Sequence, residues 1–162
     1  MQNPPGLPKR SGPKPNTSDC LPHSQLNQNA PVDMQETLWD RMSRMASVET
    51  GQSDVSVPGA RAVFVLDSKR FGPSCACMTG NEFAHIHPHN DGSLHLTLPE
   101  AVRCDAIEKG WAEPHPLAGR DKRAPETVVM VFGPRDRDEL ETVWCLVKTS
   151  HAFATGEIGW TS

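Results

Sequence analysis

The sequence predicts an α+β domain in which a small antiparallel sheet, including a histidine-bearing hairpin, packs against two or three helices. Three segments carry apolar residues at helical spacing, and short alternating or β-branched runs lie between them. Two of these runs flank a turn that ends in glycine, which is typical of a β-hairpin. With 162 residues, the chain has room for one such domain.

The first expected elements are a helix and a strand. Asp33 and Glu36 form a capping-box pattern, and apolar residues then recur at helical spacing, so we expect an amphipathic helix over about 34–46. The β-rich run 63–66 predicts a short strand, and the stretch 67–80, with its glycines and proline, predicts a loop.

The later elements follow from the same signals. A proline before and a glycine after bound a helix expected over about 99–109. The apolar run 127–132 predicts a buried strand. A second capping-box pattern at 136–139 begins a last helix, which we expect to end near Gly156.

The chain divides by composition into a tail and a domain. Residues 1–32 hold few aliphatic side chains and cannot bury enough apolar surface to offset the entropy of ordering, so we expect a disordered Pro-rich tail there and a single α+β domain at 33–162. The prolines and glycines of this tail are Pro4, Pro5, Gly6, Pro8, Gly12, Pro13, Pro15, Pro22 and Pro31.

Charge and hydropathy exclude two classes of partner. The net charge of −4 and the pI near 5.9 give no electrostatic footprint for nucleic acid. No stretch approaches 18 consecutive apolar residues, and the first 20 residues lack the apolar run of a secretory signal. We therefore expect a soluble, cytoplasmic protein that binds a small molecule, with its oligomeric state left open.

The five cysteines predict no disulfide framework, because their number is odd. Cys75 and Cys77 are spaced as neither a zinc-type nor a thioredoxin-type pair, and Cys104 and Cys145 fall on apolar stripes of expected helices. Reduced thiols are expected.

The informative region is the expected hairpin, 82–89 and 93–98. A three-residue loop at 90–92 would place His87 opposite His95 and His85 opposite Thr97, with all the histidines on one face. The other face would then hold only apolar side chains, whereas a two-residue loop would bury an imidazole among them. The expected core-face residues are Ile86, Leu94, Leu96 and Leu98.

Imidazoles clustered on one face have two chemical uses. Neutral imidazole binds zinc, iron, copper or nickel, and histidine also acts as an acid or base near neutral pH. His85, His87 and His95 are therefore candidates for a transition-metal site or for metal-free acid–base work, while the bland alternative is a solvated polar face.

A second group of candidates lies between the second and the third expected helix. Pro114 and Pro116 fix the backbone around His115, so this imidazole is aimed. Trp111 could stack on a flat ligand or simply fill the core. Arg135 could bind a carboxylate or enolate, or pair with an acidic residue of the next helix.

These residues resemble the motifs of the fungal luciferase domain family. The hairpin segments 83–87 and 93–96 are similar to its central motif, and 110–119 with 133–135 are similar to its later motifs in the same order. The resemblance covers about residues 82–156. His89 departs from the pattern, and so does the polar, Pro-rich start of the chain, where the luminous proteins carry a hydrophobic segment.

The resemblance implies an activity and a set of site residues. The luminous members oxygenate 3-hydroxyhispidin, a hydroxylated styryl-pyrone, with molecular oxygen and without an established metal or organic cofactor. Carried over to this chain, the family pattern implies catalytic and substrate-binding residues, which are His85, His87, His95 and His115 for catalysis and Trp111 and Arg135 for substrate.

We therefore expect an oxygen-dependent oxidoreductase of monooxygenase or dioxygenase type that acts on a small planar enol or pyrone, without light emission. One alternative is a metal enzyme with His85, His87 and His95 as ligands, joined by Glu82 or His115. The other alternative is a non-catalytic small-molecule binding domain.

Overall fold

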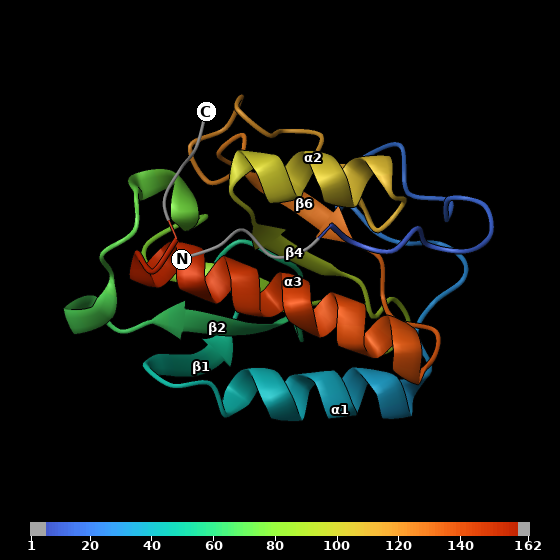
Figure 1. Ribbon diagram of the computed structural model, residues 1–162, viewed down its shortest axis with the longest axis horizontal. Coiled ribbons are helices and arrows are strands. Elements are labelled where there is room, and N and C mark those ends of the chain that lie inside the picture. Colours follow the sequence, from blue (N-terminus) through green and yellow to red (C-terminus); the bar gives the residue numbers. More distant parts are fainter. Residues whose placement is uncertain (1–5, 159–162) are drawn as a thin grey trace.

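The computed structural model describes residues 6–158 and has the predicted α+β architecture (Figure 1). Six strands form one antiparallel sheet in the order β1-β2-β3-β4-β6-β5. Two short 3-10 turns, Asp67–Lys69 and Ser74–Ala76, lie in the expected loop. The helices and strands are α1 Val32–Ser43, β1 Val48–Gln52, β2 Arg61–Val65, β3 Glu82–Ile86, β4 Leu94–Thr97, α2 Glu100–Glu108, β5 Ala112–Pro114, β6 Val128–Val131 and α3 Arg137–Thr155.

All three helices lie on the same side of the sheet (Figure 1). The core lies between them and the near face of the strands, where the predicted residues Ile86, Leu94, Leu96 and Leu98 are fully buried. Helix α3 runs across the middle of the sheet and contacts β2, β3 and β4. Burial of this apolar surface is the main stabilising contribution to the fold.

Helix ends were predicted with mixed success. Asp136 accepts a hydrogen bond from the backbone N–H of Glu139 at the start of α3, and Gly156 ends this helix at a left-handed φ of 81°. The capping box at the start of α1 was wrong, because α1 begins after Pro31 and no side chain caps it. Glu36 instead forms an ion pair with Arg61.

The hairpin register differs from the prediction by two residues. His85 lies opposite His95, and the backbone N–H of His87 bonds to the carbonyl of Ser93 at 2.9 Å, so the loop spans 88–92. Residue 88 is a proline, which has no N–H to continue the ladder, and this favours the longer loop. A shift of two residues leaves every side chain on its predicted face.

The sequence did not reveal strands β1 and β5. Strand β1 is mostly exposed and β5 has only three residues, so neither has a clear alternation. Among the described helices, none is long and apolar enough to cross a membrane. All five cysteines are free, and Cys104 and Cys145 are exposed on their helices rather than on apolar stripes.

The segment before α1 contains no helix and no strand longer than an isolated bridge between Thr17 and Gln25, within residues 6–31. Its backbone nevertheless contacts the domain: the Leu7 N–H bonds to Asp105, and the Arg10 N–H bonds to the carbonyl of Lys109. The first five residues of the expected tail and the last four of the expected domain lie outside the described residues. A disordered tail and a domain at 33–162 therefore stay predictions.

Candidate active site

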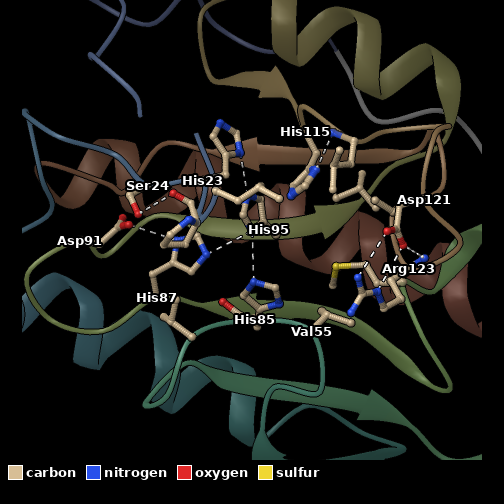
Figure 2. Close-up of a pocket in the computed structure, with 18 residues that line it drawn as sticks. His23, Ser24, Val55, His85, His87, Asp91, His95, His115, Asp121 and Arg123 are labelled. Carbon is tan, nitrogen blue, oxygen red and sulfur yellow. Dashed lines mark hydrogen bonds and ion pairs between the residues drawn. The ribbon is translucent and has the colours of Figure 1, made fainter. Parts of the chain in front are cut away.

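The sheet face away from the helices carries a pocket of about 450 Å³ (Figure 2). Histidines of β3, β4 and the adjoining loop line it, and its walls come from three irregular segments, 21–24, 55–57 and 117–124. This volume is within the range of about 300–1,000 Å³ that is usual for small-molecule sites. Apolar side chains line much of the wall, namely Leu21, Val55, Val57, Met78, Leu117 and Val128.

The structure brings the three predicted hairpin histidines together. His95 Nδ1 lies 3.2 Å from His85 Nε2 and 3.1 Å from His87 Nε2. All three rings are buried, with residue exposures of 1% for His85, 3% for His87 and 5% for His95. Their inner ring nitrogens thus converge on one point beside the pocket.

A fully buried carboxylate holds the outer nitrogen of His85. Glu82 Oε2 lies 2.7 Å from His85 Nδ1, and Glu82 also accepts hydrogen bonds from the hydroxyl of Ser53 and the backbone N–H of Asp54. Within residues 6–158, no lysine or arginine pairs with Glu82. A carboxylate only accepts hydrogen bonds when ionised, so His85 Nδ1 carries hydrogen and Nε2 carries a lone pair.

His87 is held in the same manner from the hairpin loop. Its Nδ1 lies 2.8 Å from the hydroxyl of Ser93 and 3.4 Å from Asp91 Oδ2. The Ser93 hydroxyl donates to Asp91 Oδ1, so it accepts from His87. His87 Nε2 is therefore also a lone-pair nitrogen facing His95.

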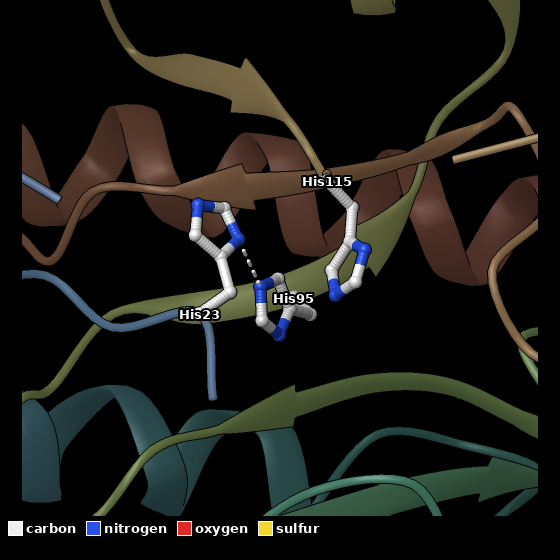
Figure 3. A group of neighbouring side chains, drawn as sticks. All are labelled: His23, His95 and His115. Carbon is white, nitrogen blue, oxygen red and sulfur yellow. Dashed lines mark hydrogen bonds between the residues drawn. The ribbon is translucent and has the colours of Figure 1, made fainter. Parts of the chain in front are cut away.

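A fourth histidine, His23, comes from the irregular segment before α1 (Figure 3). Its Nδ1 lies 2.9 Å from His95 Nε2, and its Nε2 lies 2.8 Å from Glu113 Oε1, a carboxylate that also pairs with Lys14. His23 was not predicted, because no periodicity in the sequence places it in the fold. The signal available was one histidine in a segment otherwise poor in chemically active side chains.

His115, whose backbone we expected the flanking prolines to fix, also lies against this group. Its ring centroid lies 4.8 Å from that of His95, in an edge-on orientation (Figure 3). Its Nδ1 accepts the backbone N–H of Leu117 at 3.0 Å. A neutral His115 therefore carries its hydrogen on Nε2 and can donate it to a ligand.

The hydrogen bonds around His95 lack one hydrogen. Three lone pairs face this ring, from His85 Nε2, His87 Nε2 and His23 Nδ1. A neutral His95 has one N–H, and whichever nitrogen carries it, at least one close N···N contact has no hydrogen between its atoms. A cation, either a further proton or a metal ion, would satisfy the cluster.

Burial opposes the further proton. It lowers the pKa of His23 and His85, lowers that of His95 well below the ordinary value, and lowers that of His115 to about 4. Neighbouring histidines lower the pKa of His95 further, because each charged ring would repel the next. Neutral imidazoles, the form that binds metals, are thus favoured at neutral pH.

Two groups of three histidines could hold a metal ion. One is the predicted set His85, His87 and His95, and the other is His23, His95 and His115. In each group the candidate ligand atoms all lie within 4.8 Å of one another.

A charged pair lies elsewhere on the pocket wall. Arg123 Nε bonds to Asp121 Oδ1 at 3.2 Å, and both side chains line the pocket (Figure 2). The side chain of Arg123 is 65% exposed, at the rim of the pocket. Neither residue was predicted from the sequence.

The two predicted substrate-binding residues lie outside the pocket lining. Trp111 is buried in the core, and its Nε1 donates to the carbonyl of Pro8. Arg135 forms an ion pair with Glu139, with Nε 2.9 Å from Oε1, and bonds to the carbonyl of Ser11. Both side chains hold the segment before α1 against the domain, which agrees with the non-functional alternative for each.

Comparison with known proteins supports the family resemblance. The family model "Luciferase domain" matches residues 80–150. This range includes four of the five clustered histidines, namely His85, His87, His95 and His115. The luciferases of Armillaria ostoyae and Armillaria gallica are each 29% identical to this chain over 167 aligned residues, covering 94% of the chain and 63% of each relative. The luciferase of Neonothopanus nambi is 27% identical over 165 residues, covering 93% of the chain and 62% of that protein.

The chain spans less than two thirds of the length of these relatives. No solved structure matches it. A match over 94% of the chain must include most of residues 6–31, so the segment that carries His23 lies within the region of similarity. The chain is therefore similar to the luciferase domain family over residues 80–150 and to these fungal luciferases over most of its length.

Proposed function

We propose that the chain is an oxygenase-like enzyme that binds a small planar enol or pyrone-type compound in the histidine pocket and prepares it for reaction with molecular oxygen. The observation that carries this proposal is the convergence of His85, His87 and His95 on one point beside a pocket of suitable size. Buried polar groups concentrated in a largely apolar pocket are typical of an active site.

The pocket offers complementary contacts to a flat, weakly acidic molecule. Apolar side chains such as Val55 and Leu117 would pack on its faces, and the enol oxygen would lie at the convergent histidine nitrogens. His115 Nε2–H would donate to a second oxygen of the ligand, and Arg123 would attract its negative charge from the rim. The arginine of the proposal is therefore Arg123 rather than Arg135.

The proposed reaction balances without an organic cofactor. The enol loses its O–H proton at the histidine centre and becomes an enolate, which is richer in electrons. The enolate carbon then supplies the electron pair for a new C–O bond to molecular oxygen, which is reduced to a peroxide. The proton returns to the terminal peroxide oxygen, so the product is the hydroperoxide of the substrate.

Oxygen uptake tests this proposal. A panel of hydroxypyrones and catechol-like enols is incubated with the protein, and oxygen consumption is recorded together with the mass of the product. We expect uptake with at least one member of the panel and a loss of at least about a hundredfold in His87→Ala, as is usual when an acid–base group is removed.

The matched control is His89→Ala. His89 lies on the same hairpin, but its side chain is exposed, pairs with Glu36 and does not line the histidine pocket. This variant should retain the rate of the unchanged protein. Tight binding of a panel member without oxygen uptake would support the non-catalytic alternative and exclude oxygenation of that compound.

A further inference from the structure

We infer that His85, His87 and His95 bind a divalent first-row transition-metal ion, through Nε2 of the first two and Nδ1 of the third. This site does not depend on the proposed oxygenation, since the ion would be bound whichever reaction follows. Of the two uses expected for these histidines, a metal site and metal-free acid–base work, the inference favours the metal site. The ion would also fill the close contact at His95 that has no hydrogen between its nitrogens.

The spacing of the nitrogens suits one ion. Metal–nitrogen bonds of about 2.0–2.1 Å place neighbouring ligand atoms about 2.8–3.0 Å apart in octahedral geometry and about 3.3–3.4 Å apart in tetrahedral geometry. His95 Nδ1 lies 3.2 Å from His85 Nε2 and 3.1 Å from His87 Nε2. Two of the three distances therefore suit one ion, and all three candidate ligand atoms lie within 4.8 Å of one another.

Each ligand also has the support that metal-binding histidines usually have. Such a histidine donates its other N–H to a carboxylate, a carbonyl or water, which fixes its tautomer and orientation. Here His85 donates to Glu82, and His87 donates toward the Ser93–Asp91 pair.

The third ligand, His95, is supported by a chain of two hydrogen bonds. With the ion on Nδ1, His95 donates from Nε2 to His23 Nδ1, and His23 in turn donates from Nε2 to Glu113. Every close contact of the four rings then contains either a hydrogen or the ion. With the carboxylates behind these rings ionised, no arrangement of four neutral rings without an ion achieves this.

The buried carboxylates around the histidines also favour a bound metal ion. Glu82, Asp91 and Glu113 are all buried behind neutral imidazoles, and within the described chain the lysine or arginine that pairs with any of them is Lys14, on Glu113. A dication at the centre would offset the remaining negative charge. Buried charges without such compensation are costly.

The alternative group, His23, His95 and His115, fits less well. His115 Nδ1 accepts the Leu117 N–H, which leaves Nε2 protonated in the neutral ring and so unable to bind a metal. An ion at His95 Nε2 would also lose the hydrogen bond to His23.

The ligand set selects the class of metal. Neutral imidazoles suit zinc, iron, copper and nickel, whereas magnesium and calcium prefer oxygen ligands. Three protein ligands beside a pocket leave coordination positions open to a small molecule. An ion there would lower the pKa of an enol bound to it, as it does for water, so that solvent could take the proton.

Cobalt(II) binding tests the site without reference to activity. Protein purified without a histidine tag is stripped with chelator, dialysed and titrated with Co²⁺, and the visible absorption of the bound ion is recorded. We expect one ion per chain and at least about a hundredfold weaker binding in His87→Ala. Glu82→Gln, which removes the carboxylate behind His85 and keeps the size of the side chain, should weaken binding by about tenfold to a hundredfold.

Two further variants separate the possible sites. His89→Ala and His115→Ala should bind Co²⁺ as the unchanged protein does, and His115→Ala still decides the matter if His87→Ala fails to fold. Loss of binding in His115→Ala with full binding in Glu82→Gln would move the site to the other group and overturn the inference.

Elemental analysis completes the test. Binding below about 0.1 ion per chain, with Co²⁺, Zn²⁺ or Fe²⁺ in excess, would also overturn the inference. Oxygen uptake at the full rate by stripped protein would separate the reaction from the ion, whereas metal binding without any uptake would count against the proposed function alone.

Discussion

The two faces of strand β4 are covered in different ways. On one face Leu94 and Leu96 pack beneath the helices, in a core whose stability depends on buried area. On the other face His95 lies among histidines contributed by segments far apart in the sequence, beneath chain with little regular secondary structure. Apolar packing tolerates many arrangements, whereas each buried imidazole depends on a particular partner. The chemistry of the molecule is therefore concentrated on the face with the less regular cover.

The largest expected effect is a difference in amide hydrogen exchange between the strands of the sheet and the irregular segment 11–24. The amides of β3 and β4 are bonded in ladders on both sides, whereas residues 11–24 make isolated bonds such as that from Ser18 to Ser24. Local opening of segments held by isolated bonds costs little, while core strands open only with global unfolding. We expect the segment to exchange at least about a thousandfold faster than the strands, which corresponds to about 4 kcal/mol.

Mass spectrometry of peptic fragments measures this difference. Equal protection of both regions would show that the cover is as stable as the sheet, and would contradict the prediction of a disordered tail. Complete exchange of the segment within seconds would support it. Saturating Co²⁺ should slow exchange around His23 if the ion orders the hydrogen-bond chain that ends at Glu113.

The sequence carried most of the information on the helix-covered face. Alternation places Leu94 and Leu96 on one side and His95 on the other, and this assignment survived a register error of two residues because side chains alternate with a period of two. The error itself arose in the loop, where Pro88 and the bond from the Ser93 N–H to Asp91 fix a longer turn.

The pocket face was predictable only in part. His85, His87, His95 and His115 were expected from strand parity and from rigid flanking prolines, and the structure brings them together. The placement of His23 depends on long-range hydrogen bonds across 72 residues, which no local pattern encodes. Trp111 and Arg135 illustrate the converse, since these residues of functional type bond to Pro8 and Ser11 in the segment before α1 and do not line the pocket.

Acid should lower the free energy of unfolding through the histidines of the pocket face. Unfolded histidines take up protons near pH 6.5, whereas burial and neighbouring histidines lower the pKa of His115 to about 4 in the folded chain. Between these values the unfolded state binds more protons, so the free energy of unfolding should fall as the pH falls from about 6.5 to about 4. The pKa values of His23, His85 and His95 are lowered in the same direction.

Urea unfolding in chelator at a series of pH values measures this effect. His115→Gln should flatten the slope in this window by up to about one proton per chain. Glu36→Gln is the control, because hydrogen bonds from Arg61 and His89 lower the pKa of Glu36 to about 2, so its contribution is lost below about pH 4.5. A His115→Gln slope equal to that of the unchanged protein would contradict the assignment.

The smallest expected effect concerns two arginines, one that lines the pocket and one that lies outside it. Arg123 lines the pocket, so Arg123→Ala should raise the KM for an anionic substrate by about twofold to fivefold, as expected for an exposed charge. Arg135 lies outside the pocket and holds the segment before α1, so Arg135→Ala should leave KM near its original value and lower the free energy of unfolding by about 0.5–1 kcal/mol. Steady-state kinetics at low ionic strength, where screening is weakest, gives the sharpest comparison. A larger rise of KM in Arg135→Ala than in Arg123→Ala would mean that the irregular cover, rather than the charge at the rim, determines how the substrate binds.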